Sequence, residues 1–295
     1  MGVFFLVLLL ILGCKPPVQQ STLQPETHSY TIDNRTIQVI EPLTTHCIWT
    51  HVELVDSTFL DNCRDGEIYN IILWIGHWQS DHTIEYWYSD AVLTDLIGII
   101  HAADSNFRVY PFLYWGDSPV DISKSNNRNV MYAEIEECVN KGFDGFQDDL
   151  ERYSGTITDY IAYLQGVAST VHSLGKVASA AVPASIAYNV ETVYSSLTLD
   201  FVCPMFYNGG PYNQIELDYC VPRVLKNSAV PVSCGLRIDR PVERAFSLED
   251  QLGWIDGVLG AGSYDKFDSI SIWLFDDMSG DDWTAWDNWL AAKVK

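Results

Sequence analysis

Basic residues are scarce in this sequence, and so are the short patterns that mark metal and cofactor sites. Only 17 Lys and Arg stand against 39 Asp and Glu in 295 residues, which gives a net charge of −22 at pH 7. A chain this acidic repels phosphate backbones, so we expect no nucleic-acid partner. No C-x-x-C pair occurs and no His–Cys cluster has zinc spacing, so we expect no metal and no cofactor.

A hydrophobic run long enough to cross a bilayer as a free-standing helix is also missing at the start of the chain. The apolar run Val3 to Leu12 has instead the length of a signal-peptide core, so we expect residues 1–14 to act in export. The ending ILGC resembles a lipobox, which would attach the protein to a membrane through lipidated Cys14. A short uncleaved anchor is the alternative, because no Lys or Arg precedes the run. The proline-containing residues 15–35 predict a polar linker, and the location expected is extracellular or cell-surface.

Six cysteines follow Cys14 and allow two interpretations. An exported protein could hold up to three disulfides, and Cys47 with Cys63 is the first pair by proximity in sequence. Alternatively, these cysteines are buried thiols that behave as small apolar residues. The sequence leaves both interpretations open.

Apolar and aromatic residues are abundant, at 47% and 13% of the chain, and they lie in short runs that alternate with amphipathic stretches. Strands that are apolar on both faces and alternate with helices predict an α/β fold with a parallel sheet. Eight repeats in about 250 residues fit a single (β/α)8 TIM barrel, which we place at residues 36–295. An open doubly wound sheet fits less well, because no glycine-rich phosphate loop follows any run. The expected strands lie within 47–54, 68–76, 107–115, 142–151, 176–184, 199–208, 230–238 and 267–277.

Polar residues follow the apolar part of several of these runs. In a TIM barrel the catalytic side chains lie at the C-terminal ends of the strands. The recurrence therefore predicts a site at that end of the barrel. The polar stretches are 115–117, 149–151, 207–208, 237–239 and 276–277.

The stretch GFDGFQDDLE, which ends at Glu151, combines four acidic side chains with two phenylalanines. If it continues as a strand, Gln147, Asp149 and Glu151 point into the barrel mouth, because side chains alternate between faces. Phe146 and Leu150 then face the helices. Two carboxylates on one face raise the pKa of one of them, which can then hold a proton, as glycosidic bond cleavage requires. The alternative is an acidic loop that only caps the next helix.

The longer pattern resembles the active-site signature of glycoside hydrolase family 18 (GH18), the chitinase-like barrels, which is written D-G-x-D-x-D-x-E. Asp144, Gly145, Asp149 and Glu151 match this signature. The resemblance implies that Glu151 is the general acid that protonates the leaving oxygen. Asp149 would orient the substrate's own acetamido group, whose carbonyl oxygen attacks the anomeric carbon. This substrate-assisted retaining mechanism needs no metal and no protein nucleophile.

Two further motifs resemble the same family. The sequence CPMFYN is similar to the sixth-strand M-x-Y-D, with Met205 and Tyr207 as the matching residues. The sequence SISIWLF is placed like the last strand, where the family presents a tryptophan, here Trp273, as the floor of the sugar site. Tyr207 would then hydrogen-bond the acetamido group in catalysis. The resemblance spans roughly residues 46–290, and the residues expected to contact sugar are Asp144, Gln147, Met205, Asn208, Trp273 and Trp115.

Three positions depart from the family pattern. Gln147 stands where the family has an aspartate that tunes the charge of Asp149. Asp148 stands where an apolar, outward residue is expected, which puts the local register in doubt. Asn208 replaces the aspartate after Tyr207.

The sequence therefore supports three hypotheses. The first is an exported glycoside hydrolase acting on a polymer or oligosaccharide that contains N-acetylhexosamine, because Glu151 is retained. The second is a lectin-like barrel that binds carbohydrate without turnover. The third is a barrel glycosidase that uses Asp148 or Asp149 with Glu151 on a glycan without an acetamido group.

Overall fold

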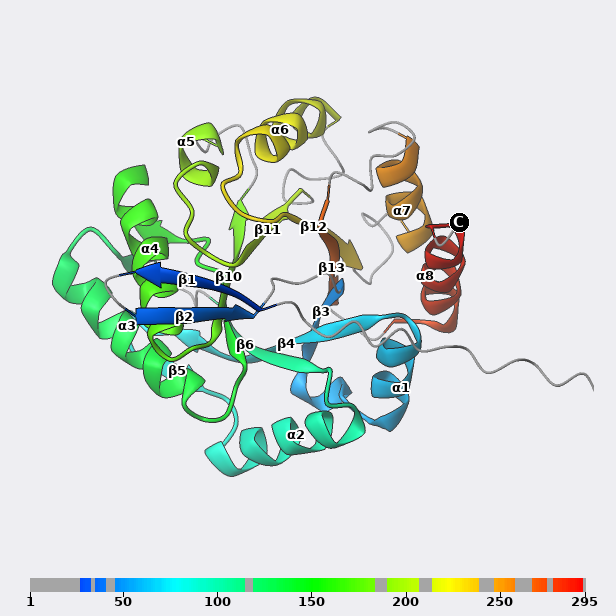
Figure 1. The fold of residues 1–295 in the computed structure, drawn as a ribbon, viewed down its shortest axis with the longest axis horizontal. Helices are drawn as coiled ribbons and strands as arrows, with labels where there is room; N and C mark the ends of the chain where they lie inside the picture. The colour runs from blue at the N-terminus through cyan, green and yellow to red at the C-terminus, as the bar shows by residue number, and fades with distance from the viewer. Residues whose placement is uncertain are drawn as a thin grey trace, which may run out of the picture.

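Apolar runs form strands and amphipathic stretches form helices, and the two alternate along the chain. The computed structural model describes residues 27–32, 35–40, 46–114, 119–183, 190–206, 214–238, 247–257, 267–274 and 278–293. A strand overlaps each of the eight predicted ranges, and the helices surround these strands, which confirms the predicted (β/α)8 barrel (Figure 1). The barrel strands are β3 (His46–His51), β4 (Ile68–Trp78), β6 (Arg108–Tyr114), β8 (Gly145–Asp148), β10 (Val177–Pro183), β11 (Phe201–Met205), β12 (Ser233–Ile238) and β13 (Ser269–Leu274).

Helix starts agree with the capping residues in the sequence. The Ser89 side chain accepts a hydrogen bond from the Val92 amide ahead of α2. Ser247 and Asp250 form a capping box ahead of α7. Val92 itself is exposed on the first turn of α2. The helices are α1 (Ser57–Asp65), α2 (Asp90–Ala103), α3 (Ser125–Val139), α4 (Ile157–Ser173), α5 (Val190–Tyr194), α6 (Gln214–Asn227), α7 (Leu248–Gly257) and α8 (Gly280–Lys293), with a 3₁₀ turn η1 (Val52–Leu54).

The barrel is nearly closed by parallel pairing. The hydrogen-bonded strand order is β11-β10-β8-β6-β4-β3-β13-β12. The strands β11 and β12 stand at the two ends of this order. One parallel β-bridge, between Val202 and Val232, connects them. The Val202 amide also donates to the Pro231 carbonyl at 3.0 Å. All eight C-terminal strand ends therefore meet at one end of the barrel, where the sequence predicts the site.

Smaller pairings lie outside the barrel proper. An antiparallel hairpin precedes the first barrel strand, and the predicted boundary at residue 36 falls inside it. The end of β4 folds back against β5 (Ile84–Tyr86). A short parallel pair, β7 (Val120–Asp121) with β9 (Tyr153–Ser154), joins the loops that follow β6 and β8. The strands of the hairpin are β1 (Thr27–Ile32) and β2 (Arg35–Ile40).

Two layers of buried side chains stabilise the barrel. One lies between the strands and the surrounding helices, and the other fills the interior that the strands enclose. The inner layer packs closely on Gly145, where a Cβ would lie 2.7 Å from the Tyr110 ring and 2.1 Å from the Val177 carbonyl oxygen, so no larger residue fits there. Cys47 lies in the inner layer, whereas Cys63 of α1 lies in the outer one. Both are buried thiols, so the alternative of a disulfide between them was wrong.

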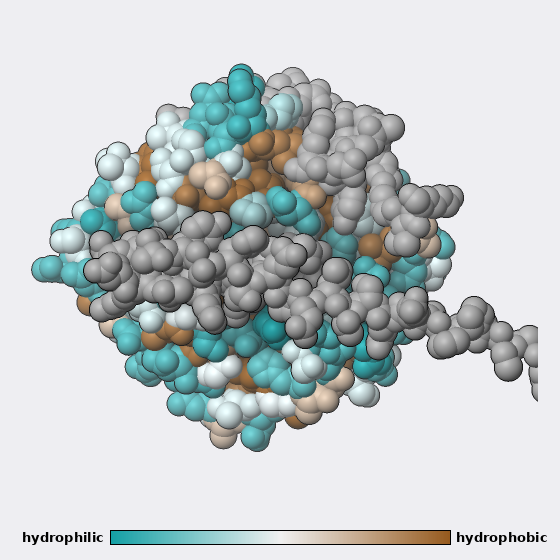
Figure 2. Space-filling view, in the orientation of Figure 1, coloured by the Kyte–Doolittle hydropathy of each residue, from teal (hydrophilic) through white to brown (hydrophobic). Residues whose placement is uncertain are grey.

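On the face shown in Figure 2, polar residues cover most of the periphery, and apolar residues gather nearer the middle. Within the described ranges, no helix is both long enough and apolar enough to span a membrane.

Candidate active site

The end of β8 carries the acidic stretch that the sequence singled out. Gln147 faces the inside of the barrel, where its Oε1 accepts a hydrogen bond from the Ser179 hydroxyl of β10. Asp149 follows two positions later on the same face. The Glu151 amide donates to the Asp149 carbonyl at 3.1 Å, so the chain turns tightly after the strand, and the Glu151 carboxyl is near enough for its charge to act on the Asp149 carboxyl.

Asp149 is a buried carboxyl without a hydrogen-bond partner among the described residues. Its side chain is 1% exposed, and neither carboxyl oxygen has a donor within reach. Burial raises the pKa of Asp149 well above its usual value, and the negative charges of Glu151 and Asp148 raise it further. Both effects favour the protonated form of the Asp149 carboxyl over the ionised form.

Asp148 faces the helices rather than the mouth. The Tyr163 hydroxyl of α4 donates to Asp148 Oδ1 at 2.7 Å, and burial raises the pKa of Asp148 to about 6. The strand therefore keeps its alternation, and a hydrogen-bonded carboxyl occupies the outward position where an apolar residue is expected. The hypothesis that Asp148 pairs with Glu151 in catalysis was wrong, because Asp148 points away from the mouth.

An aromatic floor lies inside the barrel. The Trp273 ring packs on Trp49 with centroids 4.3 Å apart, and on Phe112 at 5.0 Å. Phe112 is paired with Gln147 between β6 and β8, so the floor adjoins the acidic strand. Met205, which is 2% exposed, lines a small cavity together with Trp49 and Trp273. A pyranose ring can pack its apolar face on such a surface.

Aromatic rings continue from this floor toward the rim. Trp74 lies 5.8 Å from Phe112 and 5.0 Å from Trp87, measured between ring centroids. Trp87 is 43% exposed and donates its Nε1 hydrogen to His77 Nδ1 at 3.2 Å. Trp78 belongs instead to the layer between strands and helices.

Asp144, which was predicted to contact sugar, lies at the opposite end of the barrel strand from Asp149. It precedes β8 at the N-terminal end, where its Oδ2 accepts a hydrogen bond from the Val109 amide at 2.9 Å. The same oxygen lies 2.8 Å from His101 Nε2. The length of β8 separates Asp144 from Asp149, so Asp144 fastens neighbouring elements instead. Tyr207, Asn208 and Trp115 lie outside the described residues.

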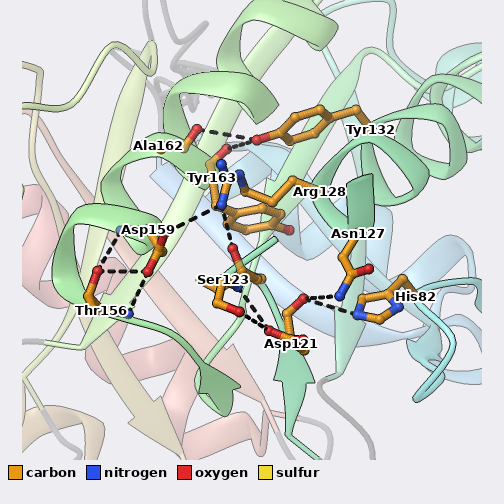
Figure 3. Close-up of polar contacts among 11 residues, drawn as sticks. His82, Asp121, Ser123, Asn127, Arg128, Tyr132, Thr156, Asp159, Ala162 and Tyr163 are labelled. Carbon is orange, nitrogen blue, oxygen red and sulfur yellow. Dashed lines mark hydrogen bonds and ion pairs between the residues drawn. The ribbon is translucent and has the colours of Figure 1, made fainter. Parts of the chain in front are cut away.

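Residues that the sequence did not single out fix the loop after Glu151 (Figure 3). The Arg128 guanidinium of α3 donates to the Ile122 carbonyl at 2.5 Å and lies 3.5 Å from Asp159 Oδ1. Asp159 forms a capping box with Thr156 at the start of α4. Glu151 lies in the short segment between β8 and β9. The barrel sheet holds the first end of this segment, and the pairing of β9 with β7 holds the second end. The T-x-x-D pattern at 156–159 could have predicted the capping box from the sequence. The Arg128 contact could not be predicted in this way, because it joins distant parts of the sequence.

Comparison with known proteins supports the fold. A chitinase from Bacteroides thetaiotaomicron is 11% identical, covering 83% of this chain and 94% of its own, with a TM-score of 0.61. A GH18 chitinase from Flavobacterium johnsoniae is 14% identical, covering 85% and 95%, with a TM-score of 0.57. A xylanase and α-amylase inhibitor protein from Scadoxus multiflorus is 16% identical, covering 83% and 97%, with a TM-score of 0.60.

No protein-family model matches the chain, and no curated protein matches it. The chain has the fold of the GH18 chitinase barrels, and the predicted resemblance is confirmed at the level of the fold. The same fold also occurs in an inhibitor protein, so the activity has to be inferred from the site.

Proposed function

We propose that this protein is a glycoside hydrolase that cleaves glycans containing N-acetylhexosamine. One observation carries the proposal: the buried Asp149 carboxyl has no described hydrogen-bond partner and lies beside Glu151 at the C-terminal end of a barrel strand. A buried polar group without a partner is costly, so the site favours a ligand that supplies a donor. The N–H of an acetamido group is such a donor.

The Asp149 and Glu151 carboxyls have different roles in the proposed reaction. Hydrogen bonding from the acetamido N–H stabilises the ionised form of Asp149, so that the shared proton resides on Glu151. Glu151 then passes this proton to the glycosidic oxygen as the bond to the anomeric carbon breaks. The acetamido carbonyl oxygen attacks that carbon and forms a cyclic oxazolinium intermediate, whose positive charge the Asp149 carboxylate stabilises.

Water completes the reaction. Glu151, now ionised, removes a proton from a water molecule, which opens the intermediate at the anomeric carbon. Two inversions at that carbon give net retention. In this proposal Trp273 and Met205 form the surface below the sugar, Tyr207 bonds the acetamido group, and Asn208 and Trp115 contact substrate.

A panel of labelled chitin, peptidoglycan and plain glucan oligomers tests the proposal. We expect cleavage only where the reacting sugar carries an acetamido group. Glu151→Gln should lower the cleavage rate by about 10²–10⁴-fold, whereas the control Glu137→Gln, on an exposed side chain of α3, should leave it unchanged. Cleavage of plain glucan at a similar rate, with a covalent glycosyl-enzyme, would contradict the mechanism.

A second candidate is a carbohydrate-binding or inhibitor-like barrel without turnover. The fold shared with a xylanase and α-amylase inhibitor protein and the unusual Gln147 favour it. Such a protein would bind the oligomers equally well as wild type and as Glu151→Gln, and would cleave none of them.

The proposal also includes export, supported by the apolar run that ends before Cys14. Mass spectrometry of the mature protein should show a start near Cys14, with or without lipid. A full-length chain that begins at Met1 in the cytosol would contradict export.

A further inference from the structure

An exposed tryptophan, Trp87, continues the row of rings from the floor of the candidate site toward the rim. The contacts in this row run from Trp273 to Phe112, from Phe112 to Trp74 and from Trp74 to Trp87. Trp87 follows β5 and is 43% exposed. A ring this exposed needs a contact that fixes its orientation, because a freely rotating side chain must be ordered each time a ligand packs on it.

A hydrogen bond to His77 of β4 provides that contact. The indole Nε1 of Trp87 donates to His77 Nδ1 at 3.2 Å, with the ring centroids 5.9 Å apart. An indole nitrogen can only donate, so Nδ1 must be the unprotonated nitrogen of a neutral imidazole. A protonated imidazole carries a hydrogen on both nitrogens and has no acceptor left. The bond therefore exists only while His77 is neutral.

Two groups of the hairpin that β4 forms with β5 face the other nitrogen of His77. Gln79 Nε2 lies 3.0 Å from His77 Nε2, and Glu85 Oε2 lies 3.6 Å from it. A neutral imidazole has a single acceptor; the Gln79 amide can turn its oxygen toward Nε2, whereas the indole of Trp87 has no such alternative. The Glu85 carboxylate can form an ion pair with the imidazolium. Tyr114 of β6 is the sheet partner of His77, and a tyrosine hydroxyl stays protonated in the pH range in which a histidine titrates.

The second histidine of the same hairpin, His82, makes a hydrogen bond of the opposite kind. Its Nε2 lies 3.0 Å from the Asp121 carbonyl oxygen, which also accepts from the Asn127 side-chain amide (Figure 3). A carbonyl oxygen only accepts, so His82 is the donor, and it can donate whether the imidazole is neutral or protonated. Protonation therefore breaks the contact of His77 and leaves that of His82.

We propose that His77 is a positioning residue that fixes the Trp87 ring for packing on a sugar ring while its imidazole is neutral, and releases the ring when it is protonated. On protonation, Nδ1 changes from an acceptor to a donor opposite a group that can only donate, and the imidazolium pairs with Glu85. A histidine changes its charge between about pH 5 and 8, so glycan binding at the rim should weaken toward the acidic end of this range. The proposal rests on the proposed function only in taking a sugar as the ligand of Trp87.

Two-dimensional ¹H–¹⁵N NMR tests the switch without any glycan. The indole N–H of Trp87, assigned with Trp87→Phe, and the ring nitrogens of His77, assigned with His77→Gln, are followed from pH 8 to pH 5. We expect Nδ1 of His77 to be the unprotonated nitrogen at pH 8. The indole N–H resonance should shift upfield as the pH falls, with the same midpoint as the His77 ring. A hydrogen on Nδ1 at pH 8, or an indole resonance that does not follow His77, would overturn the proposal.

Two variants separate this hydrogen bond from general effects of pH. His77→Gln supplies an amide oxygen that can accept from Trp87 and does not titrate, so the indole resonance should stay constant. His82→Asn is the matched control, because asparagine tolerates the positive φ of 74° at this position, and Trp87 should titrate there as in wild type. A titration of Trp87 that persists in His77→Gln, or disappears in His82→Asn, would contradict the role of His77.

Glycan binding provides a separate measurement. In calorimetry with an N-acetylglucosamine oligomer, the loss of affinity between pH 8 and pH 5 should be about two- to tenfold larger in wild type than in His77→Gln, the range of a single ring contact. An equal loss in both proteins would overturn the role of His77 in binding. If no glycan binds and the indole titrates as expected, the proposed function fails and the hydrogen-bond switch stands. If glycan binds and the indole does not titrate, the switch fails and the proposed function stands.

Discussion

Asp148 gives the most quantitative prediction, because its carboxyl is buried on the helix side of β8 and takes no part in the proposed chemistry. Its pKa is raised from 3.8 to about 6 by burial, even though the Tyr163 hydroxyl bonds it. A folded-state pKa above the unfolded value means that the protonated form stabilises the fold. This contribution is fully present below about pH 4 and is lost as the pH rises through 6.

The size of the effect follows from the same values. At ~1.36 kcal/mol per pH unit, the difference between 3.8 and about 6 is worth about 3 kcal/mol of unfolding free energy. Asp148→Asn keeps an oxygen for the Tyr163 hydroxyl and removes the titration. Between pH 4 and pH 8, wild type should therefore lose about 2.4 kcal/mol more unfolding free energy than the variant, because the full difference is reached only well below pH 4.

Urea unfolding followed by tryptophan fluorescence, at one-unit steps of pH, measures this difference. The comparison uses the slope against pH, because the side-chain amide that the substitution introduces also changes the absolute stability. Asp95→Asn, an exposed position on α2, is the control and should keep the wild-type slope. If Asp148→Asn and wild type lose stability in parallel, Asp148 is not the buried titrating group described here.

Three further predictions concern the site and the opposite end of the barrel. Glu151→Gln should retain glycan binding and lower turnover by about 10²–10⁴-fold in a reducing-end assay, the scale of general acid catalysis; normal turnover would remove Glu151 from its role. Trp273→Ala should weaken oligosaccharide binding by roughly tenfold in calorimetry, because a ring contact is worth about 0.5–1.5 kcal/mol; unchanged affinity would mean that Trp273 does not contact sugar. The hydrogen bond to Asp200 raises the pKa of His172, so the stability that this pair contributes is full below pH 6.5 and is lost as the pH rises through the folded-state pKa. His172→Gln should therefore reduce the fall of the melting temperature above pH 6.5. An unchanged dependence of the melting temperature on pH would contradict the pairing.

The barrel was predictable because each strand carries its own signal. The run IYNIILWIG forms most of β4, and the weaker CIWTHVEL contains all of β3 except its first residue, since both runs are apolar on two faces. The α6 helix gave no such signal, because Pro222 lies inside it. Proline removes a backbone donor and disfavours a helix interior, so local propensity argued against an element that the barrel imposes.

The candidate site was predictable only where local alternation decides it. Parity along β8 places Gln147 and Asp149 on one face and Asp148 on the other. The partners of these residues are Ser179 and Tyr163, and both come from later elements. No pattern within the acidic stretch indicates which later side chain will bond it, so the contacts that set its electrostatics required the structure.

Position relative to a strand, rather than residue type, separates the aspartates that stabilise the N-terminal end of the barrel from Asp149 of the candidate site. Asp144, Asp200 and Asp268 each precede a strand, and each accepts a hydrogen bond from a backbone amide, at 2.9, 2.7 and 2.8 Å. These carboxylates satisfy amides at the N-terminal end of the barrel and so stabilise it. Asp149 follows its strand and is left without a partner among the described residues, at the end where a ligand can supply one. The signature D-G-x-D-x-D-x-E therefore spans a whole strand, and its first aspartate fastens the fold whereas its last two acidic residues form the candidate site.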